Sequence, residues 1–70
     1  MKISARNVLK GTVLKITEGA VNAEIILEIA SGVKIVSVIT KSSVAELGLK
    51  VGKQACAVIK ASSVLVGVDE

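Results

Sequence analysis

The 70-residue sequence predicts an all-β domain, a small five-stranded barrel with one short helix between the third and fourth strands. Three observations lead to this fold class. Val, Ile and Leu dominate in short runs, glycines punctuate those runs, and a single stretch replaces strand-like alternation with helical spacing. Seventy residues suit one domain, so we expect residues 1–70 to form a single domain rather than several units.

The first apolar run, Asn7–Thr17, is predicted to be the first strand. Gly11 lies inside it, and a glycine within a strand suggests a bulge or a bend, which a small barrel needs. The stretch Glu18–Asn22 follows as the first turn.

The second run alternates most clearly and is predicted to be a strand with one buried face. The apolar face would carry Val21, Ala23, Ile25, Leu27 and Ile29, and the polar face Asn22, Glu24 and Glu28. Ala30–Gly32 then makes a hairpin turn, and Val33–Ile39 returns as the third strand.

The pattern changes to helical spacing within Thr40–Gly52, and this predicts a helix of two turns at most. Its apolar positions are Val44, Ala45 and Leu47. Ser43 precedes Glu46 by three residues, as in a capping box, but Thr40 is an equally good N-cap. Gly48 stands where the residue after a helix often adopts a left-handed conformation.

Two further strands complete the prediction. Gln54–Ile59 is the fourth, Lys60–Ser63 interrupts the pattern, and Val64–Val68 is the fifth. Three strands, a short helix and two more strands is the order of the OB-fold, a five-stranded Greek-key barrel. An SH3-like barrel is the main competitor, and the helix between the third and fourth strands favours the OB-fold.

Composition predicts an oligomer. Hydrophobic residues make up 51% of the chain, and none of them is aromatic. A domain of this size buries only a limited core, and a single cysteine cannot form an intrachain disulfide. We therefore expect copies of the chain to associate and bury the surplus aliphatic surface between them.

Several function classes are disfavoured. The sequence has no His and no visible pairing of a nucleophile with a base, so it does not predict an enzyme. It also has no cluster of metal ligands, so it does not predict a cation site. Cys56 is expected to be a small buried residue. The net charge of +3 is mild, and an OB-fold that binds nucleic acid relies on aromatic stacking that this chain lacks. No signal segment or bilayer-length apolar run is apparent, so a cytoplasmic location with no membrane contact is expected.

Two short stretches combine one cation with small hydroxyl residues and contain no carboxylate. They are "SARN" at Ser4–Asn7 and "KASS" at Lys60–Ser63. Taken separately, the first could be a polar lead-in with a solvated Arg, and the second a plain surface turn. Taken together, they suggest a cradle for a small oxyanion, because backbone N–H groups, hydroxyls and cations are all donors.

Four stretches give the chain a specific resemblance. They are "ISARNVLKGTV", "EGAVNAEI", "VITKSSVAELGL" and "AVIKASSVLV", and they cover nearly the whole sequence in order. The chain resembles the molbindin (Mop) family, which is built on the TOBE-type molybdate-binding domain. The resemblance implies a cytoplasmic OB-fold hexamer, a trimer of dimers, that binds molybdate or tungstate between subunits without an organic cofactor.

The resemblance also implies two kinds of site. The first kind would use Ser4, Ala5, Arg6 and Asn7 of one chain with Lys60, Ala61 and Ser62 of a neighbouring chain. The second kind would lie near a symmetry axis and use Gly19, Ala20, Val21, Asn22 and Thr40. Storage of molybdate is the function we expect; a molybdate-responsive regulatory module is the alternative, and an OB-fold nucleic-acid binder is a weaker one.

Overall fold

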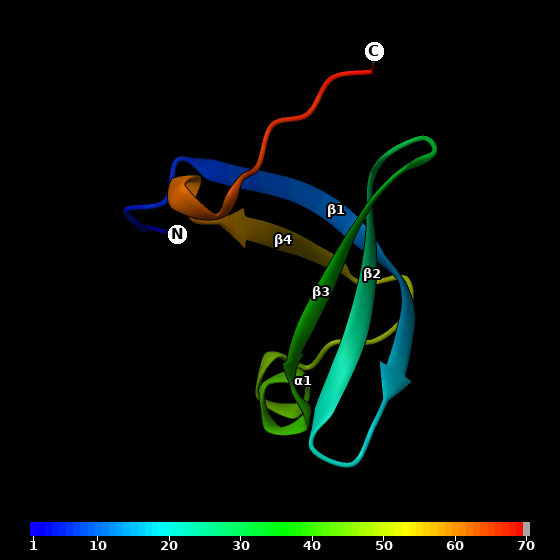
Figure 1. The fold of residues 1–70 in the computed structure, drawn as a ribbon. Coiled ribbons are helices and arrows are strands. Elements are labelled where there is room, and N and C mark those ends of the chain that lie inside the picture. The colour runs from blue at the N-terminus through cyan, green and yellow to red at the C-terminus, as the bar shows by residue number, and fades with distance from the viewer. Residues whose placement is uncertain (70) are drawn as a thin grey trace.

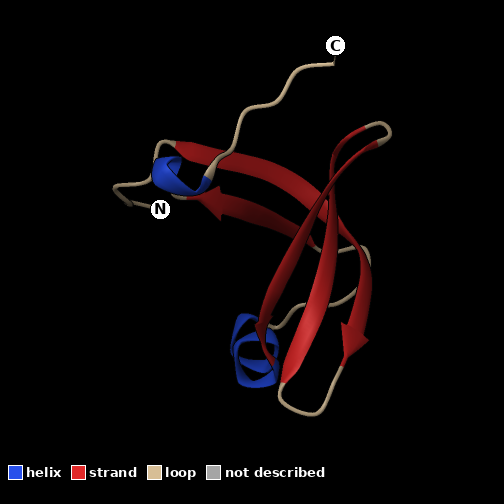
Figure 2. Cartoon of the chain, in the orientation of Figure 1, coloured by secondary structure: helices blue, strands red, loops and turns tan. Residues whose placement is uncertain are grey.

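The computed structural model describes residues 1–69 and contains four strands and one α-helix (Figures 1 and 2). The elements in chain order are β1 (Asn7–Glu18), β2 (Asn22–Ala30), β3 (Val33–Thr40), α1 (Lys41–Leu47), β4 (Gln54–Ile59) and the 3-10 turn η1 (Ala61–Ser63). The predominantly β fold and the helix between the third and fourth strands are therefore confirmed.

The four strands form one antiparallel sheet in the order β3-β2-β1-β4. The long strand β1 pairs with β4 over Asn7–Thr12 and with β2 over Thr12–Glu18. A register shift between Val13 and Lys15 marks a bulge, and a bulge increases local bending. As Figure 1 shows, β1 curves between its two partners, so the sheet has the shape of half a barrel.

Gly11 has a different role from the predicted one. The irregularity in pairing lies two to four residues further on, between Val13 and Lys15, whereas Gly11 itself is regularly paired with Ala55. A Cβ atom at Gly11 would lie 2.7 Å from the carbonyl oxygen of Glu28 and 3.1 Å from the Cγ2 atom of Ile29. Glycine is thus required at this position because the backbone of β2 passes close to β1.

The core lies on the concave side of the sheet and is small. Its buried residues are Val13, Ala23, Ile25, Leu27, Val44 and Ala57. The predicted alternation of the second strand is confirmed at Ala23, Ile25 and Leu27. Val21 is a correction: it is 70% exposed because it precedes β2 and belongs to the turn.

Helix α1 is fixed at both ends by local hydrogen bonds. The Thr40 hydroxyl oxygen accepts a hydrogen bond from the backbone N–H of Ser43 at 3.1 Å, so Thr40 is the N-cap rather than Ser43. Gly48 ends the helix with φ of 62°, and its N–H donates to the carbonyl oxygen of Ala45. Val44 is the helix residue that reaches the core.

Two further sequence predictions are not met in the single chain. Val64–Val68 has no strand conformation assigned and pairs with no strand of the described residues, so four strands are present where five were expected. Figure 1 shows this segment leaving the body of the molecule after η1. Cys56 is half-buried rather than buried, because it lines two open pockets between β3 and β4.

Candidate anion-binding site

The two cationic motifs meet at one end of the β1–β4 pair. Asn7 begins β1 and is paired with Ile59, which ends β4. The Asn7 side-chain Nδ2 also donates a hydrogen bond to the Ile59 carbonyl oxygen at 3.2 Å, across 52 residues of sequence. Ser4–Asn7 and Lys60–Ser63 are consequently neighbours within the same chain.

Lys60–Ser63 forms a tight turn that leaves donors uncommitted. The Ser63 N–H donates to the Lys60 carbonyl oxygen at 2.9 Å, and the Val64 N–H donates to the Ala61 carbonyl oxygen at 3.2 Å. The N–H groups of Ala61 and Ser62 open the turn, and such first-turn groups have no acceptor inside their own helix. They are available to an external acceptor.

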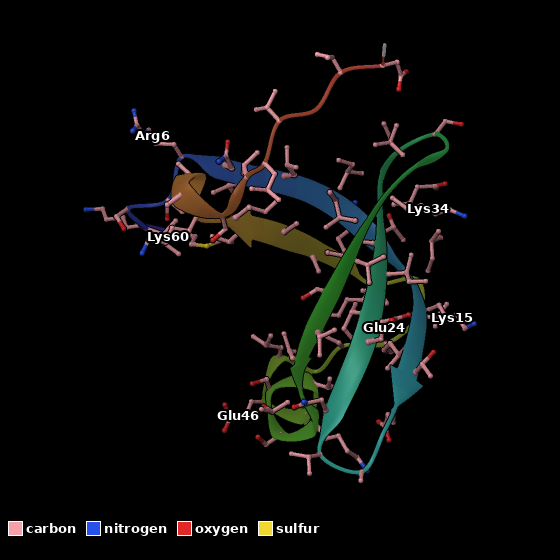
Figure 3. The ribbon with its side chains drawn as sticks, viewed as in Figure 1. Arg6, Lys15, Glu24, Lys34, Glu46 and Lys60 are labelled. Atoms are coloured by element: carbon pink, nitrogen blue, oxygen red, sulfur yellow. The ribbon has the colours of Figure 1, made fainter. Side chains whose placement is uncertain are left out.

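The charged side chains at this end are both solvated. Arg6 and Lys60 are exposed, whereas Ala5 and Asn7 are half-buried. Figure 3 shows Arg6 and Lys60 at the same end of the molecule, with their side chains extending in different directions. Within residues 1–69, the ion pair that forms joins Lys41 to Glu18, so both cations of the first set keep their charge available.

The second predicted set gathers at the opposite end of the molecule, beside α1 (Figure 1). Asn22 and Thr40 are paired across β2 and β3. The Gly19 N–H donates to the Asn22 carbonyl oxygen at 2.8 Å, and the Lys41 N–H donates to the Val21 carbonyl oxygen at 2.9 Å. The turn Gly19–Asn22 and Thr40 are therefore neighbours within one chain.

The hydroxyl of Thr40 is already engaged in capping the helix. It donates to the Ser43 Oγ at 2.8 Å while it accepts from the Ser43 N–H. An anion at this end would compete with the cap for the hydroxyl proton. The Asn22 side-chain amide is therefore a more accessible donor to an anion than the Thr40 hydroxyl.

Three residues at this end were not among the predicted binding residues: Lys41, Ser42 and Ser43. They follow Thr40 in the first turn of α1, and Ser42 Oγ lies 3.1 Å from Thr40 Oγ1. The segment "TKSS" has the same character as "KASS", with one cation, small hydroxyls and no carboxylate. That composition is the signal that could have identified it as a third donor segment.

Over residues 1–69, no group of three His, Cys, Asp or Glu side chains is placed to hold a metal ion. The same part of the chain has no helix with the length and hydropathy needed to cross a bilayer.

The chain matches a known domain family and a relative along nearly its whole length. Residues 3–66 match the TOBE domain family. The chain is 52% identical to a probable molybdenum-pterin-binding protein of Haemophilus influenzae, over 99% of this chain and all of that protein.

Two solved structures are similar to the fold described above. A molybdate-binding protein of Sporomusa ovata has a TM-score of 0.90 and 41% identity, covering 97% of this chain and 100% of that one. The cytoplasmic molybdate-binding protein ModG, with molybdate bound, has a TM-score of 0.93 and 56% identity. That match covers 99% of this chain and 49% of the ModG chain.

Proposed function

Because this chain belongs to the TOBE domain family, we propose that it binds molybdate as a non-catalytic oxyanion carrier. The observation that carries the proposal is the pairing of Asn7 with Ile59, which joins two cationic motifs free of carboxylates in one place. The similarity to two molybdate-binding proteins along nearly the whole chain supports the same ligand.

The donor set at this end suits a tetrahedral dianion. Molybdate has four acceptor oxygens and carries no proton near neutral pH, so every partner must be a donor. The donors here are Arg6, Lys60, the Asn7 amide, the Ser4 and Ser62 hydroxyls and the Ala61 N–H. The charge-assisted hydrogen bonds from Arg6 and Lys60 would be the strongest. Asp or Glu would repel the anion, and neither motif contains one.

Selectivity follows from size and protonation. Tungstate is nearly as large as molybdate, so we propose that the same site accepts both anions. Sulfate has the same charge but is smaller, and a rigid shell would hold its donors too far apart. Phosphate carries a proton near neutral pH and would leave that proton without an acceptor, at a cost of about 1–3 kcal/mol.

We propose further that the complete sites lie between subunits of a hexamer arranged as a trimer of dimers. Arg6 and Lys60 are exposed and point in different directions within one chain, so a single chain offers an incomplete shell. The second set, at Gly19–Asn22 and Thr40, would form another site where several chains meet. A cytoplasmic store of molybdate, with no organic cofactor, is the role that this arrangement fits.

Calorimetric titration tests the proposed function. Molybdate and tungstate should bind with similar affinities, while sulfate and phosphate should bind at least tenfold more weakly, in line with the loss of about 1.4 kcal/mol per decade. Native mass spectrometry of the titrated protein should give the number of anions per assembly. Equal affinity for sulfate and molybdate would contradict the proposal.

A further inference from the structure

We propose that Lys53 is a positioning residue for the second set of donors, Gly19–Asn22 and Thr40, and that it acts through α1 without touching the anion. Its ammonium group holds the C-terminal end of the helix, and the opposite end of the same helix begins beside the second set. This inference rests on the proposed function, because it takes the second set to be an anion site.

Helix α1 depends on contacts outside itself for its position. It has seven residues, and a helix of this length has little stability of its own. Val44 is the helix residue that is buried in the core. The last turn of the helix contains no basic residue, so a cation that stabilises its C-terminal carbonyl groups has to come from another part of the chain.

Lys53 supplies this cation from the start of the next strand. Its Nζ donates hydrogen bonds to the carbonyl oxygens of Leu47 at 2.9 Å and of Gly48 at 3.1 Å. The N–H groups of Gly48 and Leu49 bond to carbonyl groups one turn earlier, so Lys53 takes the carbonyl groups that this local cap leaves over. A Cβ atom at Gly48 would lie 3.3 Å from Nζ, so the ammonium group sits closely against the end of the helix.

The backbone of Lys53 is anchored to the core. The N–H of Val13, a fully buried residue, donates to the Lys53 carbonyl oxygen at 2.9 Å, and the Gly52 N–H donates to the Val13 carbonyl oxygen at 2.8 Å. Two residues thus oppose one, as in a β-bulge. The Lys53 N–H also closes a turn on the Lys50 carbonyl oxygen at 3.1 Å. Lys53 therefore connects the end of α1 to a fixed point of the sheet.

The other end of α1 contacts the second set directly. The Lys41 N–H donates to the Val21 carbonyl oxygen at 2.9 Å, and the Lys41 Nζ lies 3.9 Å from a carboxylate oxygen of Glu18. Thr40, the N-cap, is paired with Asn22, and Figure 1 shows the helix beside the turn that precedes β2. Because so short a helix moves as one unit, a shift at its C-terminal end would displace these donors relative to one another.

The binding test isolates each set of donors in turn. In an Arg6→Ala/Lys60→Ala background, residual molybdate binding reports the second set, and in an Asn22→Ala background binding reports the first. Lys53→Met removes the charge and the donors but keeps the side-chain length, whereas Lys53→Arg keeps both. Lys50→Met is the matched control, because Lys50 is an exposed lysine in the same turn. Each full-length protein is titrated calorimetrically with sodium molybdate.

We expect Lys53→Met to weaken binding at the second set by about twofold to fivefold, the effect of one charge at a helix end. Lys53→Arg should restore the affinity, and Lys50→Met should not change it. Binding at the first set should be the same with Lys53 or Met. An equal loss at both sets would show a general structural role and overturn the proposal. Unchanged binding at the second set, or no residual binding in its background, would overturn it as well.

Amide hydrogen exchange tests the contact without any anion. In Lys53→Met, the N–H groups of Lys41 and Leu49, at the two ends of α1, should exchange faster because the helix opens more often, while that of Ile25 in β2 should not change. An unchanged rate at Lys41 would contradict transmission along the helix.

The two ideas can fail separately. A wild-type protein that bound no molybdate would refute the proposed function. Molybdate binding by the wild type together with no effect of Lys53→Met would refute the role of Lys53 alone.

Discussion

Asn7 and Ile59 are joined twice: they are paired in the β1–β4 ladder, and the Asn7 amide donates to the Ile59 carbonyl oxygen at 3.2 Å. Asn7 therefore serves the fold as well as the proposed site, because its second amide proton is still available for an anion. Asn7→Ala should lower the free energy of unfolding by about 0.5–1.5 kcal/mol and also weaken molybdate binding. Thermal unfolding with and without molybdate would measure both effects. If neither stability nor molybdate binding fell, Asn7 would be removed from the site.

Arg6 and Lys60 should affect binding far more than stability. Each is exposed, so Arg6→Ala or Lys60→Ala should leave the melting temperature nearly unchanged. Each removes one charge-assisted hydrogen bond to the anion, a loss of about 1.5–3 kcal/mol, or roughly tenfold to a hundredfold in affinity. Lys34→Ala is the control, since it removes the same charge from the β3 strand, away from both motifs. Unaltered affinity in both test variants would refute their assignment.

Mixing the Arg6→Ala and Lys60→Ala proteins should show whether the first site spans two chains. If Arg6 and Lys60 of one site come from different chains, refolding the two variants together should restore about a quarter of the high-affinity sites, as random association requires. Calorimetric titration of the mixture would count these sites. Sites contained within one chain would show no recovery.

Replacing Gly11 should destabilise the sheet. The added Cβ of Gly11→Ala would meet the Glu28 carbonyl oxygen at 2.7 Å, so β1 and β2 would have to move apart. Overpacking of this kind costs about 1–3 kcal/mol, and each kcal/mol lowers the melting temperature of so small a domain by about 4–8 °C. Lys10→Ala, at the exposed neighbouring position, should be nearly neutral. A Gly11→Ala protein as stable as the wild type would contradict the close approach.

Thr40 should be a measurable source of helix stability. Thr40→Ala removes the acceptor for the Ser43 N–H and should cost about 0.5–2 kcal/mol. Thr40→Ser keeps the hydroxyl and should recover most of that loss. Chemical denaturation would compare the three proteins, and a Thr40→Ala variant matching the wild type would show that the cap contributes nothing.

Much of the fold was predictable because its determinants are local. The alternation that buries Ala23, Ile25 and Leu27 is visible in the sequence, and so is the glycine that ends α1. The choice between Thr40 and Ser43 as N-cap was not, since both residues satisfy the same local pattern. The hydrogen bond from the Ser43 N–H settles it.

The remaining differences depend on tertiary contacts. Val21 fits the apolar face of the second strand by spacing, but the strand begins one residue later and leaves it in the turn. The tail reads as a strand because its residues favour one, and the single chain offers it no neighbour. Composition proposed the residues of the first site, and their role in binding stays a prediction. The structure adds that the two motifs meet at Asn7 and Ile59, across 52 residues of sequence.

The division of β1 between two partners has a consequence for folding kinetics. β2 and β3 are joined by a short hairpin and can form early. β4 can pair with β1 only after a loop of dozens of residues closes, and this loop closure slows folding. The chain contains no proline, so isomerisation cannot supply a slow refolding phase. Any refolding phase that accelerates with protein concentration must therefore report the encounter of two chains.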